Sequence, residues 1–125
     1  MATIKTIYKG NLATSTEYPM SEYPILTKAK PFGPTDLLTA SLSSCIATYI
    51  DFEAQKNNFE TPNIVVEINK TMNANGTKVV AFNTVINFKK EYSQEQKTVI
   101  EKAAQTCPVG NSLASDISRT YQFNY

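Results

Sequence analysis

The sequence contains no histidine, which removes the side chain that most often serves as a catalytic base or a metal ligand. Ser-His-Asp and Cys-His catalysis both need an imidazole, and most zinc and haem sites use one as a ligand. The only two cysteines, Cys45 and Cys107, are too few for a zinc or iron–sulfur site built from four thiolates. We therefore expect no bound metal and no cofactor.

Arginine is almost as scarce, because Arg119 is the only arginine among the 12 basic residues. A site that binds an anion through two parallel hydrogen bonds usually contains arginine. The 12 basic and 11 acidic residues leave a formal net charge of +1, and no basic stripe is interleaved with aromatic residues. This balance gives no electrostatic reason to expect a nucleic-acid partner.

Long apolar runs are absent as well, and the N-terminal residues alternate between polar and apolar instead of forming a signal peptide. We expect no membrane partner and a cytoplasmic location, where thiols are kept reduced. The 125 residues, of which 42% are hydrophobic and 18% charged, are typical of one globular domain over residues 1–125.

The first half of the chain predicts three short strands followed by a long helix. Alternation predicts strands over 2–9, 12–17 and 23–27, and the prolines and glycine of 28–35 predict a loop. Apolar residues at three- and four-residue spacing then predict a helix from Thr35 to about Asn57. Such a long helix in a small domain is expected to lie centrally and to be covered by more than its own chain.

The second half predicts a hairpin, two helices and a last strand. Alternating residues over 63–73 and 77–91 flank Asn75-Gly76, a strong hairpin-turn signal. Ser93 is placed as the N-cap of a helix to about Thr106, a short helix follows from Pro108 to Ile117, and a strand covers 121–125. The predicted fold class is α+β, an antiparallel sheet with the helices grouped on one face.

The two cysteines lie in different local settings. Cys45 is in the middle of the predicted long helix and needs a nearby donor or cation to become a thiolate. Cys107 directly precedes Pro108 at a helix start, where the helix dipole favours a low thiol pKa. Two inert core cysteines remain an alternative, because free cysteine is often simply buried. That alternative predicts sulfur atoms too far apart to bridge.

Two motifs resemble those of the OsmC/Ohr family. FGPTDLLTASLSSC, residues 32–45, is similar to the segment before the family's first cysteine: a proline, an acidic residue, Leu-Leu and small residues on a long helix. AAQTCPV, residues 103–109, is similar to the family's second motif, Cys-Pro followed by a short helix. With the Asn-Gly hairpin between them, the resemblance covers essentially the whole chain.

The resemblance implies an OsmC-like fold, an intertwined homodimer with the long helices at its centre, and a thiol-dependent peroxidase. Carried over to this chain, Cys45 would attack an organic hydroperoxide as a thiolate and become a sulfenic acid. Cys107 would then capture it as a disulfide, the reversible first stage of cysteine oxidation. A dithiol reductant, often lipoyl-linked, would reset the pair.

The chain departs from the hydroperoxide-reducing branches at the charged groups. Those branches use an arginine from the N-terminal half and a glutamate ten residues before the first cysteine. Here Thr35 stands ten residues before Cys45, the nearest acid is Asp36, and no arginine precedes Cys45. Lys28 and Lys30 are the candidate replacement cations. Asp36 has a second interpretation, compensation of the helix dipole in the first turn.

Tyr49 is a candidate for lining the site, one helical turn after Cys45, or for packing in the core. Arg119 is a further cation without motif support. Tyr18, Met20, Tyr23 and Phe32 of the N-terminal segment are expected to form an apolar pocket over the site, or alternatively to belong to an interface or the core. The alternative function is a dimeric protein of the same fold that binds a small apolar molecule or acts in stress without efficient peroxidase activity.

Overall fold

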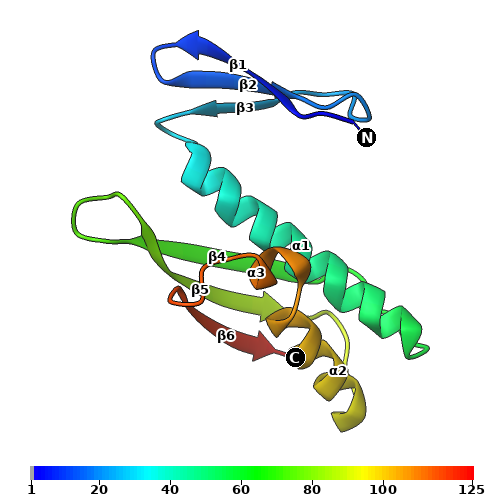
Figure 1. The fold of residues 1–125 in the computed structure, drawn as a ribbon. Coiled ribbons are helices and arrows are strands. Elements are labelled where there is room, and N and C mark those ends of the chain that lie inside the picture. Colours follow the sequence, from blue (N-terminus) through cyan, green and yellow to red (C-terminus); the bar gives the residue numbers. More distant parts are fainter. Residues whose placement is uncertain (1) are drawn as a thin grey trace. The chain divides into compact units, whose positions relative to one another are not determined.

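The computed structural model describes residues 2–125 (Figure 1). The described chain divides into two compact units, an N-terminal unit that ends at Leu38 and a C-terminal unit, Thr39–Tyr125. The helices and strands follow one another as β1 (Lys5–Gly10), β2 (Ala13–Glu17), β3 (Ile25–Lys28), α1 (Pro34–Lys56), β4 (Val65–Met72), β5 (Val79–Asn87), α2 (Gln94–Gln105), α3 (Pro108–Asn111) and β6 (Ser118–Asn124).

The N-terminal unit is an antiparallel sheet in the order β1-β2-β3. The predicted turn at Gly10 is confirmed, since this residue has a φ of +86° that glycine adopts without strain. The unit has little hydrophobic core, because every buried hydrophobic side chain among residues 2–125 belongs to the C-terminal unit. Many of its large apolar side chains are instead exposed: Ile4, Tyr8, Leu12, Met20, Tyr23, Ile25 and Leu26.

The C-terminal unit contains a second sheet, in the order β4-β5-β6. The β4–β5 hairpin is confirmed, and Gly76 in its turn has a φ of +70°. The predicted antiparallel pairing holds for β4 and β5 but not for β6, which pairs with β5 in parallel. The helices α2 and α3 form the connection that carries the chain back to the starting end of β5, which a parallel neighbour requires.

The two faces of this second sheet differ in polarity. Phe82 and Ile86 are fully buried on one face, and Arg119 on β6 is paired in register with Phe82. Helices α1 and α3 lie over this face in Figure 1, and α1 contributes the buried stripe Leu42, Ile46, Ile50 and Ala54. The other face is polar, with the side-chain amide of Asn124 donating to the amide oxygen of Asn87. The grouping of the helices on one face agrees with this burial.

Helix α2 begins with the predicted cap. The Ser93 hydroxyl oxygen accepts from the Gln96 N–H at 3.1 Å, and the Gln96 side-chain oxygen accepts from the Ser93 N–H at 2.9 Å. These reciprocal bonds form a capping box and satisfy two backbone donors. Helix α3 is shorter than predicted and ends at Asn111. Strand β6 begins earlier than predicted, at Ser118 instead of Tyr121.

Asp51 ties α1 to the segment that leads into β4. Its carboxylate accepts from the Thr61 N–H at 2.8 Å, from the Thr61 hydroxyl at 3.0 Å and from the Gln55 amide at 2.6 Å. The Thr61 N–H bond is the main reason that the pKa of Asp51 lies below its ordinary value, and burial opposes it. The charged form is therefore favoured by folding.

Asp51→Asn is expected to lower the free energy of unfolding by about 1–2 kcal/mol at pH 7, because the bonds to a charged acceptor are weakened. A lowered carboxyl pKa stabilises the fold above the unfolded-state pKa, and this contribution is lost as the pH falls through the folded-state pKa. The difference between the wild type and the variant should therefore shrink as the pH falls below about 4. Urea denaturation between pH 3 and pH 7 measures this, and a difference that stays constant with pH would contradict it.

Among residues 2–125, no helix is both long enough and apolar enough to cross a membrane.

Candidate active site at the cysteine pair

Cys45 is half-buried on α1, beside the buried stripe instead of within it. Its neighbour Ile46 takes the core position, which turns the Cys45 side chain to the flank of the helix. There it lines an open, mainly apolar groove of about 540 Å³. The groove is formed by α1 residues and the first residue of α3: Ser41, Ser44, Cys45, Thr48, Tyr49, Phe52 and Pro108.

Cys107 is fully buried, directly before α3. Burial raises the pKa of the Cys107 thiol, and the Cys45 thiol that lies beside it raises this pKa further. The Cys45 Sγ accepts from the Val109 N–H at 3.4 Å. The structure thus brings together the two predicted cysteines, although they belong to distant parts of the sequence.

The prediction of a low thiol pKa for Cys107 was wrong. Burial is the main influence and raises the pKa of Cys107, and the neighbouring Cys45 raises it further. The Gly110 N–H and the Arg119 charge act in the opposite direction without outweighing burial. Helix α3 has only four residues, so its dipole is small compared with the cost of burying a thiolate. The missing donor for mid-helix Cys45 is the Val109 N–H, which the sequence did not reveal.

Arg119 was noted in the sequence only as a further cation, and its place at the site was not predicted. It projects from β6 toward α3, and its Nη1 atom is buried without a hydrogen-bond partner among residues 2–125. A methyl group at Gly110 would overlap Nη1 and would lie 3.3 Å from the Cys107 Sγ. The guanidinium and the sulfur therefore flank the same small space above Gly110. The only sequence signal was the rarity of arginine in the chain, since no motif contains this residue.

Tyr49 lines the groove beside Cys45, half-buried, with its ring centroid 5.9 Å from that of Phe52. Lys28, Lys30, Thr35 and Asp36 belong to the N-terminal unit. The Asp36 carboxylate accepts from the Gly33 N–H at 2.8 Å, which places it in the first turn of α1 as a local partner. A role of these four residues at Cys45 stays a prediction.

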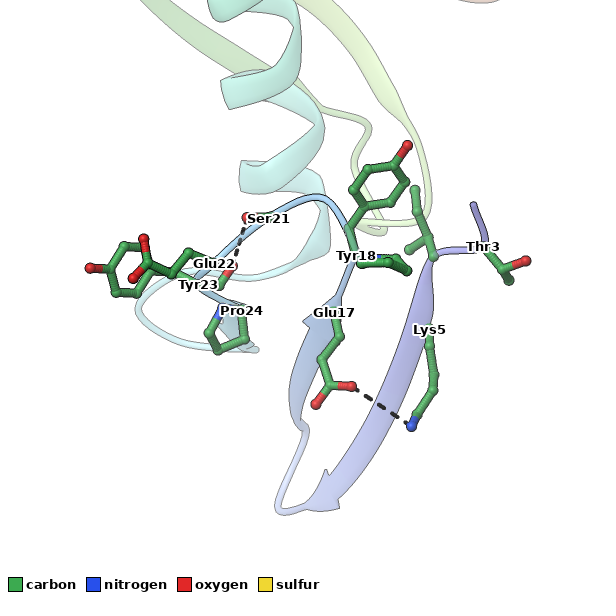
Figure 2. A pocket seen from close by; sticks show the side chains of 10 residues that line it. Thr3, Lys5, Glu17, Tyr18, Ser21, Glu22, Tyr23 and Pro24 are labelled. Carbon is green, nitrogen blue, oxygen red and sulfur yellow. Dashed lines mark hydrogen bonds and ion pairs between the residues drawn. The ribbon is translucent and has the colours of Figure 1, made fainter. Parts of the chain in front are cut away.

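A second hollow, of about 660 Å³, lies within the N-terminal unit (Figure 2). Tyr18 and Tyr23 line it, whereas Met20 and Phe32 are not among its lining residues, and a pocket of these four residues over the cysteines stays a prediction. Figure 2 shows the ion pair of Lys5 and Glu17 at 3.7 Å on its wall, with both side chains largely exposed. This hollow is larger than the groove at Cys45 but contains no cysteine, so the chemistry points to the smaller groove.

The described residues contain no cluster of three or more Cys, Asp or Glu side chains that could hold a metal ion. The site therefore contains two thiols that can react, together with backbone N–H groups and one guanidinium that can influence them. Such a set can ionise a thiol, hold a sulfur anion and form a disulfide, as thiol-based redox sites do.

The sequence profile of OsmC-like proteins matches residues 27–122. The chain belongs to the OsmC-like family. Comparison with curated proteins gives no significant match. Among solved OsmC-type structures, a protein from Psychrobacter arcticus 273-4, named for osmotic stress induction and a detoxification response, is 31% identical with a TM-score of 0.90, covering 99% of this chain and 96% of its own.

More distant members share the OsmC-like fold. The OsmC-like protein of Mycoplasma pneumoniae is 15% identical with a TM-score of 0.81, covering 100% of this chain and 98% of its own. The organic hydroperoxide resistance protein OhrB of Bacillus subtilis is 14% identical with a TM-score of 0.72, covering 99% and 98%. The expected OsmC-like α+β fold is thus confirmed over the length of the chain.

Proposed function

We propose that the chain is a thiol-dependent peroxidase that reduces organic hydroperoxides through Cys45 and Cys107. The observation that carries this proposal is the contact between a half-exposed sulfur in an apolar groove and a second, buried sulfur. An attacking thiol must be reached by the oxidant, and a resolving thiol must be reached only by its partner. Cys45 meets the first condition and Cys107 the second.

The reaction proceeds in two balanced steps. The Cys45 thiolate attacks the terminal oxygen of the hydroperoxide, an S–O bond forms, the O–O bond breaks, and the departing alkoxide takes up a proton to become an alcohol. The Cys107 sulfur then attacks the Cys45 sulfenic acid, an S–S bond forms, the S–O bond breaks, and hydroxide leaves as water after protonation. A dithiol reductant of the lipoyl type returns two electrons to the disulfide by thiol–disulfide exchange.

The test is a titration of reduced protein with cumene hydroperoxide, with free thiols counted and the intact mass measured. We expect one equivalent of oxidant to remove both thiols and the mass to fall by two hydrogen atoms. Dihydrolipoamide should then restore both thiols. The proposal is wrong if both thiols survive an excess of cumene hydroperoxide under conditions in which a known thiol peroxidase consumes it.

The proposed assembly is a homodimer. Large apolar side chains of the N-terminal unit are exposed, and so is Phe52 on α1. A second copy of the chain would cover such surfaces, which monomeric proteins rarely expose in this number. Light scattering at micromolar concentration should give twice the 13.9 kDa chain mass. A mass of one chain would contradict the dimer but would leave the proposed redox reaction unaffected.

A second candidate is binding of a small apolar molecule without efficient peroxidase activity. It is favoured by the groove itself, because none of the described residues that line it is charged. In this case Cys45→Ser should leave the thermal shift caused by an apolar ligand such as cumyl alcohol unchanged, and hydroperoxide should leave both thiols intact. Under the peroxidase proposal the oxidant removes them.

A further inference from the structure

The buried Nη1 atom of the half-buried Arg119 needs an explanation, because a charged donor is costly to bury without an acceptor. Nη1 has no partner among the described residues, and those residues show no carboxylate in an ion pair with Arg119. The side chain is nevertheless held between β6 and α3 against Gly110. Its position beside Cys107 suits contact with a negatively charged sulfur.

Cys107 is a reactive group beside Nη1 that can acquire a negative charge. The Cβ position of Gly110 overlaps Nη1 and lies 3.3 Å from the Cys107 Sγ, so both atoms border one point. The titratable and charged groups facing Cys107 are Cys45 from α1 and Arg119 and Tyr121 from β6. Among these, Arg119 supplies the only positive charge.

We propose that Arg119 serves the resolving cysteine: its guanidinium holds the Cys107 sulfur as an anion while that sulfur attacks oxidised Cys45, and Gly110 leaves the room for this contact. The part of this inference that concerns attack on oxidised Cys45 rests on the proposed function, since the oxidant is the organic hydroperoxide of that reaction. The charge contact between Arg119 and Cys107 is independent of any oxidant.

The arrangement solves a conflict in the resolving step. Burial protects Cys107 from outside oxidants but raises its pKa and keeps it protonated, whereas attack on a sulfenic acid needs the thiolate. A fixed guanidinium lowers the free energy of that thiolate in a site of low dielectric constant, where a charge contact is strong. Arg119 is thus assigned to disulfide formation and not to the first attack by Cys45.

The first test uses no hydroperoxide. In a Cys45→Ser background Cys107 is the only cysteine, so the chemical shift of its ¹³C-labelled Cβ reports its titration alone. Arg119→Met should move the midpoint upward by about one pH unit or more, which is the effect of removing an opposite charge at close range. Arg119→Lys should move it less. Lys102→Met, which removes an exposed charge from α2, should leave it within a few tenths of a unit.

Gly110→Ala provides a second variant that keeps the arginine. The added methyl group overlaps Nη1 and should displace the guanidinium, so the Cys107 midpoint should rise as in Arg119→Met. If Arg119→Met fails to fold, Gly110→Ala still tests whether Arg119 contacts Cys107. An unchanged midpoint in the variants that fold would overturn the proposal.

The second test separates the two steps by rapid mixing with cumene hydroperoxide. In Arg119→Met, loss of the first thiol should stay within about threefold of the wild type, while disulfide formation should slow by on the order of tenfold or more, following the lost thiolate fraction. Trapping by dimedone should increase because the sulfenic acid persists. A slower first step with normal disulfide formation would assign Arg119 to Cys45 and overturn the proposal. If the wild-type protein does not react with cumene hydroperoxide, the proposed function is wrong. The titration of Cys107 then still tests the contact between Arg119 and Cys107.

Discussion

Replacing Cys45 with serine is expected to lower the rate of hydroperoxide consumption by on the order of a thousandfold or more. Serine keeps the size of the side chain, but its hydroxyl has no base to ionise it, because the chain contains no histidine and the groove lining carries no charge. The buried Cys107 cannot take over, since none of its surface is exposed to an oxidant. The peroxide remaining after timed incubation measures the effect.

Cys107→Ser is the matched control for this prediction, because it removes the other sulfur of the same pair. It should consume one equivalent of cumene hydroperoxide at nearly the wild-type rate and then stop, leaving a Cys45 sulfenic acid that dimedone traps. Ser44→Ala, at an exposed position in the groove, should retain repeated turnover. If Cys45→Ser and wild type consumed peroxide equally, the assignment of the attacking sulfur would be wrong.

Phe82→Ala is expected to produce the largest loss of stability, about 3–5 kcal/mol. Phe82 is fully buried in the middle of β5, on the face that α1 and α3 cover. Its removal leaves a cavity that the paired strands on both sides hold open, since β5 is the central strand of its sheet. Urea denaturation at one fixed protein concentration measures the change, because association would otherwise alter the apparent stability.

Val65→Ala is the control for Phe82→Ala. Val65 lies on the neighbouring strand β4 with 43% of its surface exposed. Val65→Ala should therefore lower the free energy of unfolding by less than about 1 kcal/mol. Equal losses for the two variants would mean that Phe82 does not occupy the packed centre of the sheet. Arg119 is paired in register with Phe82, so Phe82→Ala should also disturb the cysteine site, which a Cys107 titration would register.

The elements that the sequence predicted well depend on neighbours in the chain. The capping box needs only Ser93 and Gln96, and the hairpin turn needs a residue such as Gly76 that tolerates a positive φ. The extent of α1 followed from the spacing of its apolar residues, which reflects a single buried face. Such signals are complete within a few residues and need no knowledge of the tertiary fold.

The features that were missed depend on distant contacts. The parallel pairing of β6 with β5 is decided by how α2 and α3 cross the sheet, and no local pattern encodes that choice. Arg119 enters the site only through this pairing. The raised pKa of Cys107 likewise arises from burial by several elements, whereas the sequence showed only the adjacent helix start. The pairing of the two motifs could be expected from the resemblance, but not their electrostatic setting.

The contact between the two sulfurs also couples redox state to folding. They are about 60 residues apart in the sequence, so a disulfide between them would close a long loop in the unfolded chain. The entropy removed from that unfolded chain corresponds to about 4 kcal/mol in favour of the folded state. Because the thermodynamic cycle is closed, the same free energy makes the folded protein a weaker oxidant than the unfolded one. In the proposed peroxidase cycle, the reductant would therefore act against the fold, and the reduced protein would be the less stable of the two forms.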